Sequence, residues 1–387
     1  MNGHNENNGT SPSATEPMRS RVQAIYSVES SRTLERFVRQ YLQLYARIDY
    51  PDGNELKPDF VQQWLFTHLF SRECNRKHPV RYKLRVLKEL MNRIESCIDD
   101  WNVEGLSDNL MDVLGDLYSS DMATYLNSSF ERSDIMYTLS NLRAEFLHSD
   151  PPHYCSNLFN PPLLFRVPTI TICEPSTILA TDGSTGVRTW EAALHIGDYL
   201  CSHPEIIRDK RVLELGSGTA YLSILCARYL GATFTFATDG CPVAISTHDS
   251  NFQLNNLHPG RIRSQQLLWE EHPGDRYLFP ELQRGETIDV ILGADIIYEI
   301  QGIIALVMML SVLLGYYPKA KVLISVTIRN PNTFADFLCR CQQRGWRFTV
   351  IEWNVQREQD QNGPFIHAMA PMIIISLCTE PRQLMLA

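Results

Sequence analysis

The sequence predicts an α/β fold in which a doubly wound, seven-stranded sheet with one antiparallel strand follows an N-terminal helical domain. Short apolar runs alternate with helical patterns over the C-terminal part of the chain, and this alternation is typical of a parallel sheet covered by helices on both faces. The predicted strands are 169–173, 211–215, 233–238, 290–294, 321–326, 348–353 and 372–377. Only a polar loop, 356–363, separates the last two runs. A hairpin at this loop would supply the single antiparallel strand.

The N-terminal part has a different pattern. From about residue 31 to 147, apolar residues recur at the three- and four-residue spacing of amphipathic helices, first in Leu34, Phe37, Val38, Tyr41, Leu42 and Tyr45. Further helices are predicted over about 58–71, 80–98 and 106–126. Proline pairs at 151–152 and 161–162 mark a boundary that a helix does not cross. We therefore expect a disordered tail over 1–28, a helical domain over 29–150 and a sheet-containing domain over 163–387.

Length and composition narrow the class of protein. A chain of 387 residues exceeds the usual size of a single core, and 44% hydrophobic residues are ample for globular packing. The formal charge of −9 gives no basic footprint for nucleic acid or membrane lipid. The ten cysteines are scattered without a CxxC pair, which argues against a zinc site and for a reducing compartment. We expect a cytoplasmic monomer that binds no metal.

A glycine turn is the strongest single motif. It follows the apolar run 211–215 as Gly216, Ser217 and Gly218, and Asp239 comes just after the next predicted strand. This order builds a nucleotide crevice at the carboxyl end of a parallel sheet, where the acid can accept ribose hydroxyls. There is no GxxxxGK[ST] motif for a triphosphate, and Ala220 stands near the third glycine position of a dinucleotide site. The predicted ligand therefore has an adenosine but no phosphate, as S-adenosylmethionine does.

Three other residues near this crevice each have two interpretations. Glu214 is buried by its pattern, and it either caps the glycine loop or contacts the amino group of the cofactor. Trp269 either covers the adenine or closes the sheet edge. Trp190 begins an amphipathic helix that either covers the cofactor or is an ordinary helix start.

The strand 290–294 ends at a possible reaction site. Gly293 and Ala294 are small where a flat ligand must pass close, and Asp295 follows at the ligand-binding edge of the sheet. Tyr298 lies three residues later and can share one pocket with Asp295 if the chain turns there. The alternative is that Asp295 caps the next helix.

Several segments in one order resemble the seven-strand protein-lysine methyltransferases with the signature (D/E)xx(Y/F). The segments are Thr185-Gly-Val-Arg-Thr-Trp190, Glu214-Leu-Gly-Ser-Gly218, Asp239, Leu268-Trp269, Ala294-Asp-Ile-Ile-Tyr298 and Val326-Thr-Ile-Arg-Asn-Pro331. Within that group, the first and last segments and the helical extension resemble the elongation factor 2 lysine methyltransferases. The motif resemblance covers about 165–380. It implies a Rossmann-like methyltransferase domain and a protein substrate, elongation factor 2, which the N-terminal helices would dock.

The resemblance also implies roles for single residues. The cofactor contacts it implies are Trp190, Gly216, Ser217, Gly218, Asp239, Trp269 and Ala294, to which the motif adds Glu214. Asp295 and Tyr298 match the signature that faces the target lysine, with Asp295 orienting the ε-amine and Tyr298 lining the channel. Two positions depart from the pattern: Ala220 where relatives often have glycine, and Leu268 where many have aspartate.

Three alternatives remain at this point. A dehydrogenase would need a third glycine and a hydride-transfer site, and neither is visible in the sequence. A non-catalytic assembly factor could keep the same fold. A methyltransferase could instead act on a small molecule or on another protein, such as a chaperone.

Overall fold

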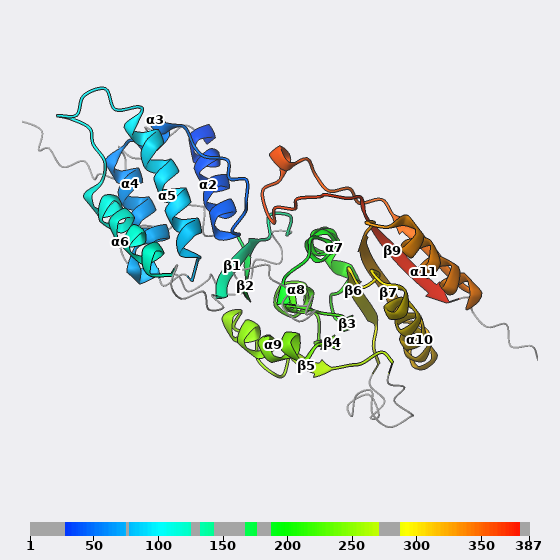
Figure 1. Cartoon of the computed structure of the whole chain (residues 1–387). Helices are drawn as coiled ribbons and strands as arrows, with labels where there is room; N and C mark the ends of the chain where they lie inside the picture. Colours follow the sequence, from blue (N-terminus) through cyan, green and yellow to red (C-terminus); the bar gives the residue numbers. More distant parts are fainter. Residues whose placement is uncertain are drawn as a thin grey trace, which may run out of the picture.

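The computed structural model describes residues 28–74, 77–124, 132–142, 167–175, 187–270 and 287–379. Residues 1–27 of the predicted tail, the proline-marked boundary and residues 185–186 of the segment 185–190, which we call the entry segment, lie outside these ranges. Within them, a group of helices from the N-terminal part lies at one end of the molecule, and the large sheet with its covering helices forms the rest (Figure 1).

The large sheet has seven strands in the order β5-β4-β3-β6-β7-β9-β8. Its strands are β3 (Arg211–Leu215), β4 (Phe234–Asp239), β5 (Ile262–Gln266), β6 (Val290–Ala294), β7 (Lys321–Thr327), β8 (Trp346–Ile351) and β9 (Met372–Thr379). Both pairings of β9, to β7 and to β8, are antiparallel, and the other pairings are parallel. The predicted hairpin and its one antiparallel strand are confirmed.

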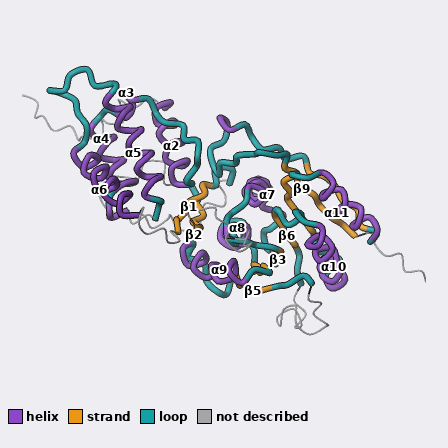
Figure 2. Tube along the Cα trace, viewed as in Figure 1, coloured by secondary structure: helices purple, strands orange, loops and turns teal. Residues whose placement is uncertain are grey.

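Helices cover both faces of this sheet, as Figure 2 shows by colour. Alternate residues of β3 explain the arrangement, because Val212 packs in one core and Leu213 in the other. The first core includes side chains of α7 (Glu191–Ser202), α8 (Tyr221–Arg228) and α9 (Pro242–Leu254). The second includes α10 (Ile300–Tyr316) and α11 (Pro331–Gln343). Two strand faces with separate apolar cores are what a doubly wound sheet requires.

The N-terminal helices have a third core of their own. They are α2 (Val28–Leu42), α3 (Gly53–Leu56), α4 (Asp59–Leu65), which continues into the π-helix η1 (Phe66–Phe70), the short η2 (Arg72–Cys74), α5 (Val80–Glu95) and α6 (Asp108–Thr124). The predicted helices over 58–71, 80–98 and 106–126 are confirmed to within a few residues. Short 3-10 turns η7 (Pro204–Ile206) and η9 (Glu358–Asp360) complete the elements.

A two-stranded sheet corrects the prediction in two places. β1 (Arg132–Thr138) lies in the stretch predicted to be helical to 147, and it pairs antiparallel with β2 (Thr169–Pro175). The run 169–173 is therefore a strand, but it belongs to this small sheet. The seventh strand of the large sheet is β5, which is missing from the predicted strands. β1 contributes Met136 to the N-terminal core and Tyr137 to the core of the large sheet.

The segment between β8 and β9 joins the N-terminal helices to the large sheet. Gln43 pairs with the backbone of Phe365 at both ends, with its Nε2 2.6 Å from the Phe365 oxygen and its Oε1 2.8 Å from the Phe365 nitrogen. Arg36 donates to the carbonyl oxygens of Glu358 and Gln361, and its guanidinium lies 5.1 Å from the Phe365 ring centroid. We call this set of contacts the α2 clamp. Because β8 ends and β9 begins at the carboxyl edge of the parallel strands, the clamp holds a segment of that edge.

Two negative findings hold for the described residues. In these ranges no helix is long and apolar enough to cross a membrane. The same ranges contain no group of three or more histidine, cysteine, aspartate or glutamate side chains that could hold a metal ion.

Candidate active site

The turn after β3 brings the backbone close to its neighbours. Gly216 and Gly218 have φ values of +61° and +52°, in the left-handed region that glycine adopts without a Cβ clash. Ala220, the N-cap of α8, also lies there at φ +65°. Although residue 220 is alanine and not glycine, its backbone has the left-handed conformation that glycine adopts most easily. Ser217 is held by its amide, which donates to the Thr238 carbonyl of β4 at 2.8 Å.

Asp239 fixes this turn from the end of β4. Its two carboxylate oxygens accept from the Gly218 amide and the Cys241 amide, each at 2.8 Å. A carboxylate has about four acceptor positions, so capacity remains for a ligand hydroxyl on each oxygen. The structure thus gives Asp239 a role in holding the loop, which does not conflict with the predicted ribose contact.

Glu214 points from β3 toward the first turn of α8. Its carboxylate accepts from both the amide and the hydroxyl of Ser223, and burial raises the pKa of Glu214 to about 8. Both contacts go to the start of α8, just after the glycine turn, so loop capping and cofactor contact both stay predictions for Glu214. A carboxyl group at the start of a helix also pairs favourably with unpaired amides there.

Ile296 joins the glycine turn to the end of β6. A Cβ added to Gly216 would lie 2.6 Å from Ile296 Cγ2, and one added to Gly293 would lie 2.4 Å from Ile296 Cδ1. Ile296 is buried between these two glycines. Trp269 lies on the same side, with its Cζ2 3.6 Å from where a Cβ on Gly216 would be. The missing side chains at 216 and 293 therefore make room for Ile296.

Asp295 is tied to the end of β7. Its Oδ1 accepts from the Thr327 amide at 3.0 Å, and its Oδ2 accepts from the Thr327 hydroxyl at 3.2 Å. Arg329 donates to Oδ2 at 2.8 Å, and its guanidinium also lies 5.3 Å from the Trp190 ring centroid. The Asp295 backbone has φ +54°, a conformation that aspartate and asparagine tolerate better than most residues. The interpretation of Asp295 as a helix cap is not supported, because α10 has Glu299 as its N-cap.

A buried chain of hydrogen bonds connects the residue before Trp190 to the residue after the glycine turn. The hydroxyls of Thr189 and Thr219 lie 2.7 Å apart. The Thr189 amide donates to Glu174 at 3.1 Å, and the same carboxylate oxygen accepts from the Tyr137 hydroxyl at 3.0 Å. Burial raises the pKa of Glu174 to about 7. The β1–β2 sheet therefore braces the entry segment just before α7.

The remaining predicted residues lie at the rim of this arrangement. Ala294 is half-buried at the end of β6, and Tyr298 is 56% exposed. Leu268, in the position where many relatives have aspartate, lies 3.4 Å from where a Cβ on Gly240 would be. All ten predicted site residues thus lie at the carboxyl ends of adjacent strands or on the entry segment beside them.

Comparison with known proteins decides the family. A family model described as lysine methyltransferase matches residues 177–344. The protein-lysine N-methyltransferase EFM3 of Chaetomium thermophilum is 38% identical over 347 residues, which cover 88% of this chain and 96% of that protein. The chain belongs to the protein-lysine methyltransferases. It is therefore an S-adenosylmethionine-dependent enzyme that acts on a protein lysine.

Two other relatives of this lysine methyltransferase match over a shorter span. EFM3 of Saccharomyces cerevisiae is 30% identical over 199 residues, which cover 47% of this chain and 56% of that protein. The protein-lysine N-methyltransferase EEF2KMT of Bos taurus is 26% identical over 223 residues, which cover 52% of this chain and 63% of that protein.

Two buried polar atoms at the site fit a polar cofactor. Neither the Ser217 hydroxyl nor the Trp269 indole nitrogen has a hydrogen-bond partner among the described residues. Buried polar groups normally have partners, and a ligand with hydroxyl, amine and ring-nitrogen groups can supply them. Ser217 lies between Gly216 and Gly218 in the turn that Asp239 holds, and Trp269 lies against the Gly216 position. The residues present thus fit S-adenosylmethionine.

Sequence reasoning missed two groups that shape the site. His248 of α9 bonds the Gly218 carbonyl through Nε2 and the Ser264 hydroxyl through Nδ1, each at 2.7 Å. A single histidine in a helix of mixed polar and apolar residues carries no recognisable pattern. The ion pair of Arg329 with Asp295 was also missed, although the segment 326–331 is part of the family resemblance. Only the fold brings the ends of β6 and β7 together.

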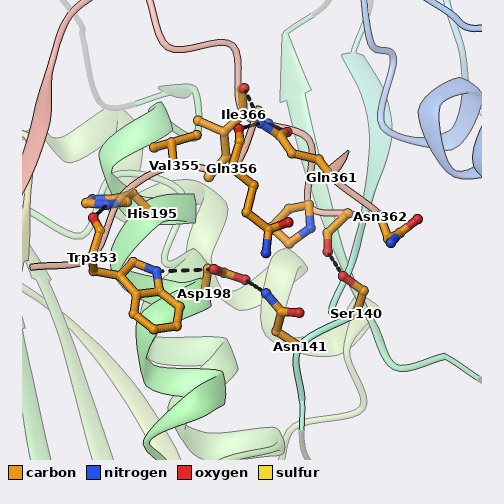
Figure 3. A pocket seen from close by; sticks show the side chains of 12 residues that line it. Ser140, Asn141, His195, Asp198, Trp353, Val355, Gln356, Gln361, Asn362 and Ile366 are labelled. Carbon is orange, nitrogen blue, oxygen red and sulfur yellow. Dashed lines mark hydrogen bonds between the residues drawn. The ribbon is translucent and has the colours of Figure 1, made fainter. Parts of the chain in front are cut away.

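A separate pocket lies between α7 and the segment after β8 (Figure 3). His195 bonds the Ser325 hydroxyl and the Trp353 carbonyl there, and Asp198 accepts from Asn141 and the Trp353 indole. None of the ten predicted site residues lines this pocket. Its lining comes from the turn after β1, from α7 and from the segment that the α2 clamp holds.

Proposed function

We propose that this enzyme methylates a lysine of translation elongation factor 2, and that the ten residues described above form its reaction site. The observation that carries the site is the closed ring of contacts at the carboxyl edge of the sheet. Asp239 holds the glycine turn, Ile296 joins that turn to Asp295, and Arg329 joins Asp295 to Trp190. Thr189 and Thr219 return the ring to the turn.

The cofactor half of this ring would be the glycine turn, Asp239 and Trp269. S-adenosylmethionine, when bound, supplies a methyl group on a cationic sulfur. The enzyme must hold the target amine in line with that methyl group and must bind the amine in its unprotonated form. A free lysine has a pKa of about 10.4, so the neutral amine is rare at neutral pH. Positioning alone can lower the barrier by several kcal/mol.

The lysine half would be Asp295 and Tyr298. Asp295 keeps one acceptor position open on Oδ1, since that oxygen accepts only the Thr327 amide among the described contacts. It can therefore orient the ε-amine by one hydrogen bond. Tyr298 follows three residues later in the chain, is exposed, and would line the approach of the lysine side chain.

The choice of elongation factor 2 rests on the resemblance and on the extension. The relative that matches 88% of this chain also spans the N-terminal helices. A mouse relative named EEF1A lysine methyltransferase 3 matches only 29% of this chain. We propose that residues 29–150 form a docking domain, because the α2 clamp holds them to the same edge as the reaction site.

The experiment uses the full-length enzyme, labelled S-adenosylmethionine and purified elongation factor 2, with the modified residue located by mass spectrometry. We expect label on one lysine. Asp295→Asn is the sharper site variant than Asp295→Ala, because asparagine keeps the left-handed backbone. It should lower the rate by about tenfold or more while cofactor affinity stays unchanged. Absence of label on elongation factor 2 would overturn the substrate assignment, and full activity of Asp295→Asn would overturn the proposed site.

A further inference from the structure

The carboxylate that faces the target lysine is part of a charge-balanced cluster. Arg329 pairs with Asp295 at 2.8 Å, and Arg188 pairs with Glu191 at 3.0 Å. Both arginines lie over the Trp190 indole, at 5.3 and 5.6 Å from its ring centroid. Two ion pairs therefore meet at one aromatic ring through their arginines, and their four charges sum to zero.

The contacts leave Asp295 firmly placed. Its side chain is only 7% exposed, whereas that of Arg329 is 48% exposed. Thr327 donates to both carboxylate oxygens. Of the roughly four acceptor positions on a carboxylate, three are taken, and the open one is on Oδ1. An amine can therefore bond to Asp295 while Arg329 stays in place.

The charge of Asp295 matters for the nucleophile. An isolated carboxylate within about 4–6 Å would favour the ammonium form of lysine, which cannot attack a methyl group. A carboxylate that is already paired with a guanidinium contributes little net field at the same place. Arginine suits this role because its guanidinium stays charged throughout the relevant pH range.

We propose that Arg329 is a positioning residue that neutralises Asp295, so that the pair accepts the substrate lysine as a free amine and orients it. The Trp190 indole holds Arg329 in place through its ring face. This inference rests on the proposed placement of the target lysine beside Asp295. It adds to that proposal the reason why an acid in this position does not keep the lysine protonated.

The test is the pH dependence of the single-turnover methylation rate. The substrate is the protein that the wild-type enzyme labels in a cell lysate, which is elongation factor 2 under the proposed function. Arg329→Gln leaves Asp295 held by Thr327 but uncompensated. We expect the rate to fall about tenfold at about pH 7 and the alkaline midpoint of the rate to rise by about one pH unit, because one unit of lysine pKa is tenfold in free amine.

Two variants separate charge from structure. Arg188→Gln removes the other arginine from the same indole but leaves the Asp295 pair, so its pH midpoint should match the wild type. Asp295→Asn combined with Arg329→Gln removes both charges and should restore the wild-type midpoint, at a lower rate. Equal loss at every pH in Arg329→Gln, or an alkaline midpoint that persists in the double variant, would overturn the inference. Loss of activity in Asp295→Asn with no midpoint shift in Arg329→Gln would refute the inference alone.

Discussion

At the residue scale, the site depends on which side chains are absent. Gly216 directly follows β3, Gly293 lies in the neighbouring strand β6, and Ile296 occupies the space that two Cβ atoms would fill. The sequence pattern suggests that a ligand makes the close approach at both positions. In the structure, the group that comes close at both positions is the buried side chain of Ile296, the residue after Asp295. The glycines therefore set the distance between the two halves of the site.

An alanine Cβ at either glycine position should clash with Ile296, and the atom of Ile296 that it meets differs between the two positions. Gly293→Ala meets Cδ1, and overpacking of this kind costs about 1–3 kcal/mol. Ile296→Val lacks Cδ1, so the double variant should recover most of the lost stability. Gly216→Ala meets Cγ2, which valine keeps, and its φ of +61° adds about 1–2 kcal/mol of backbone strain.

Chemical denaturation of the three single variants and the two double variants measures these differences. We expect Ile296→Val to rescue Gly293→Ala but not Gly216→Ala. Rescue of both glycine variants, or of neither, would contradict the placement of Ile296 between them.

At the element scale, much of the large sheet could be predicted from sequence. β3, β4, β6, β7 and β9 are rich in apolar and β-branched residues, because both of their faces are covered. β5 reads Ile-Arg-Ser-Gln-Gln and lies at the sheet edge with a largely exposed pattern, so hydrophobicity carried almost no signal for it. β1 interrupts a long helical region, and its strand conformation is set by pairing with β2, which begins about 30 residues after β1 ends.

The site residues also divide into those that could be predicted from the sequence and those that could not. Motifs with local spacing, such as the glycine turn and the Asp295–Tyr298 pair, could be recognised along the chain. The roles of Ile296, His248 and Arg329 could not, because each depends on a contact with a distant element. Arg329 reaches Asp295 only when β7 is aligned beside β6.

The α2 clamp gives a test of docking by point substitution. Deletion of residues 1–147 would also remove β1, whose Tyr137 holds Glu174 beside the entry segment. Gln43→Ala is the more selective change, because it leaves the buried backbone groups of Phe365 unpaired at a cost of about 1–3 kcal/mol.

Steady-state kinetics with the protein substrate measures the effect. If the helices dock the substrate, Gln43→Ala should raise KM for the protein by roughly fivefold or more, with unchanged cofactor affinity. Gln63→Ala is the control, since Gln63 is exposed on α4 in the same group of helices. An unchanged KM in Gln43→Ala would argue against docking through the clamped helices.

At the scale of the whole molecule, three groups of elements meet at one edge of the large sheet. The parallel strands end there with the glycine turn and the two acids. The β1–β2 sheet braces the entry segment from the side, through Glu174 and Thr189. The N-terminal helices hold the β8–β9 segment through α2. This arrangement lets a protein bound to the helices present a lysine to the same edge that holds the cofactor.

The central claim is that cofactor and lysine meet between the glycine turn and Asp295. A crystal structure of the enzyme with S-adenosylhomocysteine tests it most directly. We predict that the ribose hydroxyls contact Asp239, that the Ser217 hydroxyl or the Trp269 indole nitrogen gains a partner, and that the sulfur faces Asp295. Binding in the pocket of His195 and Asp198, or elsewhere away from the glycine turn, would contradict the account.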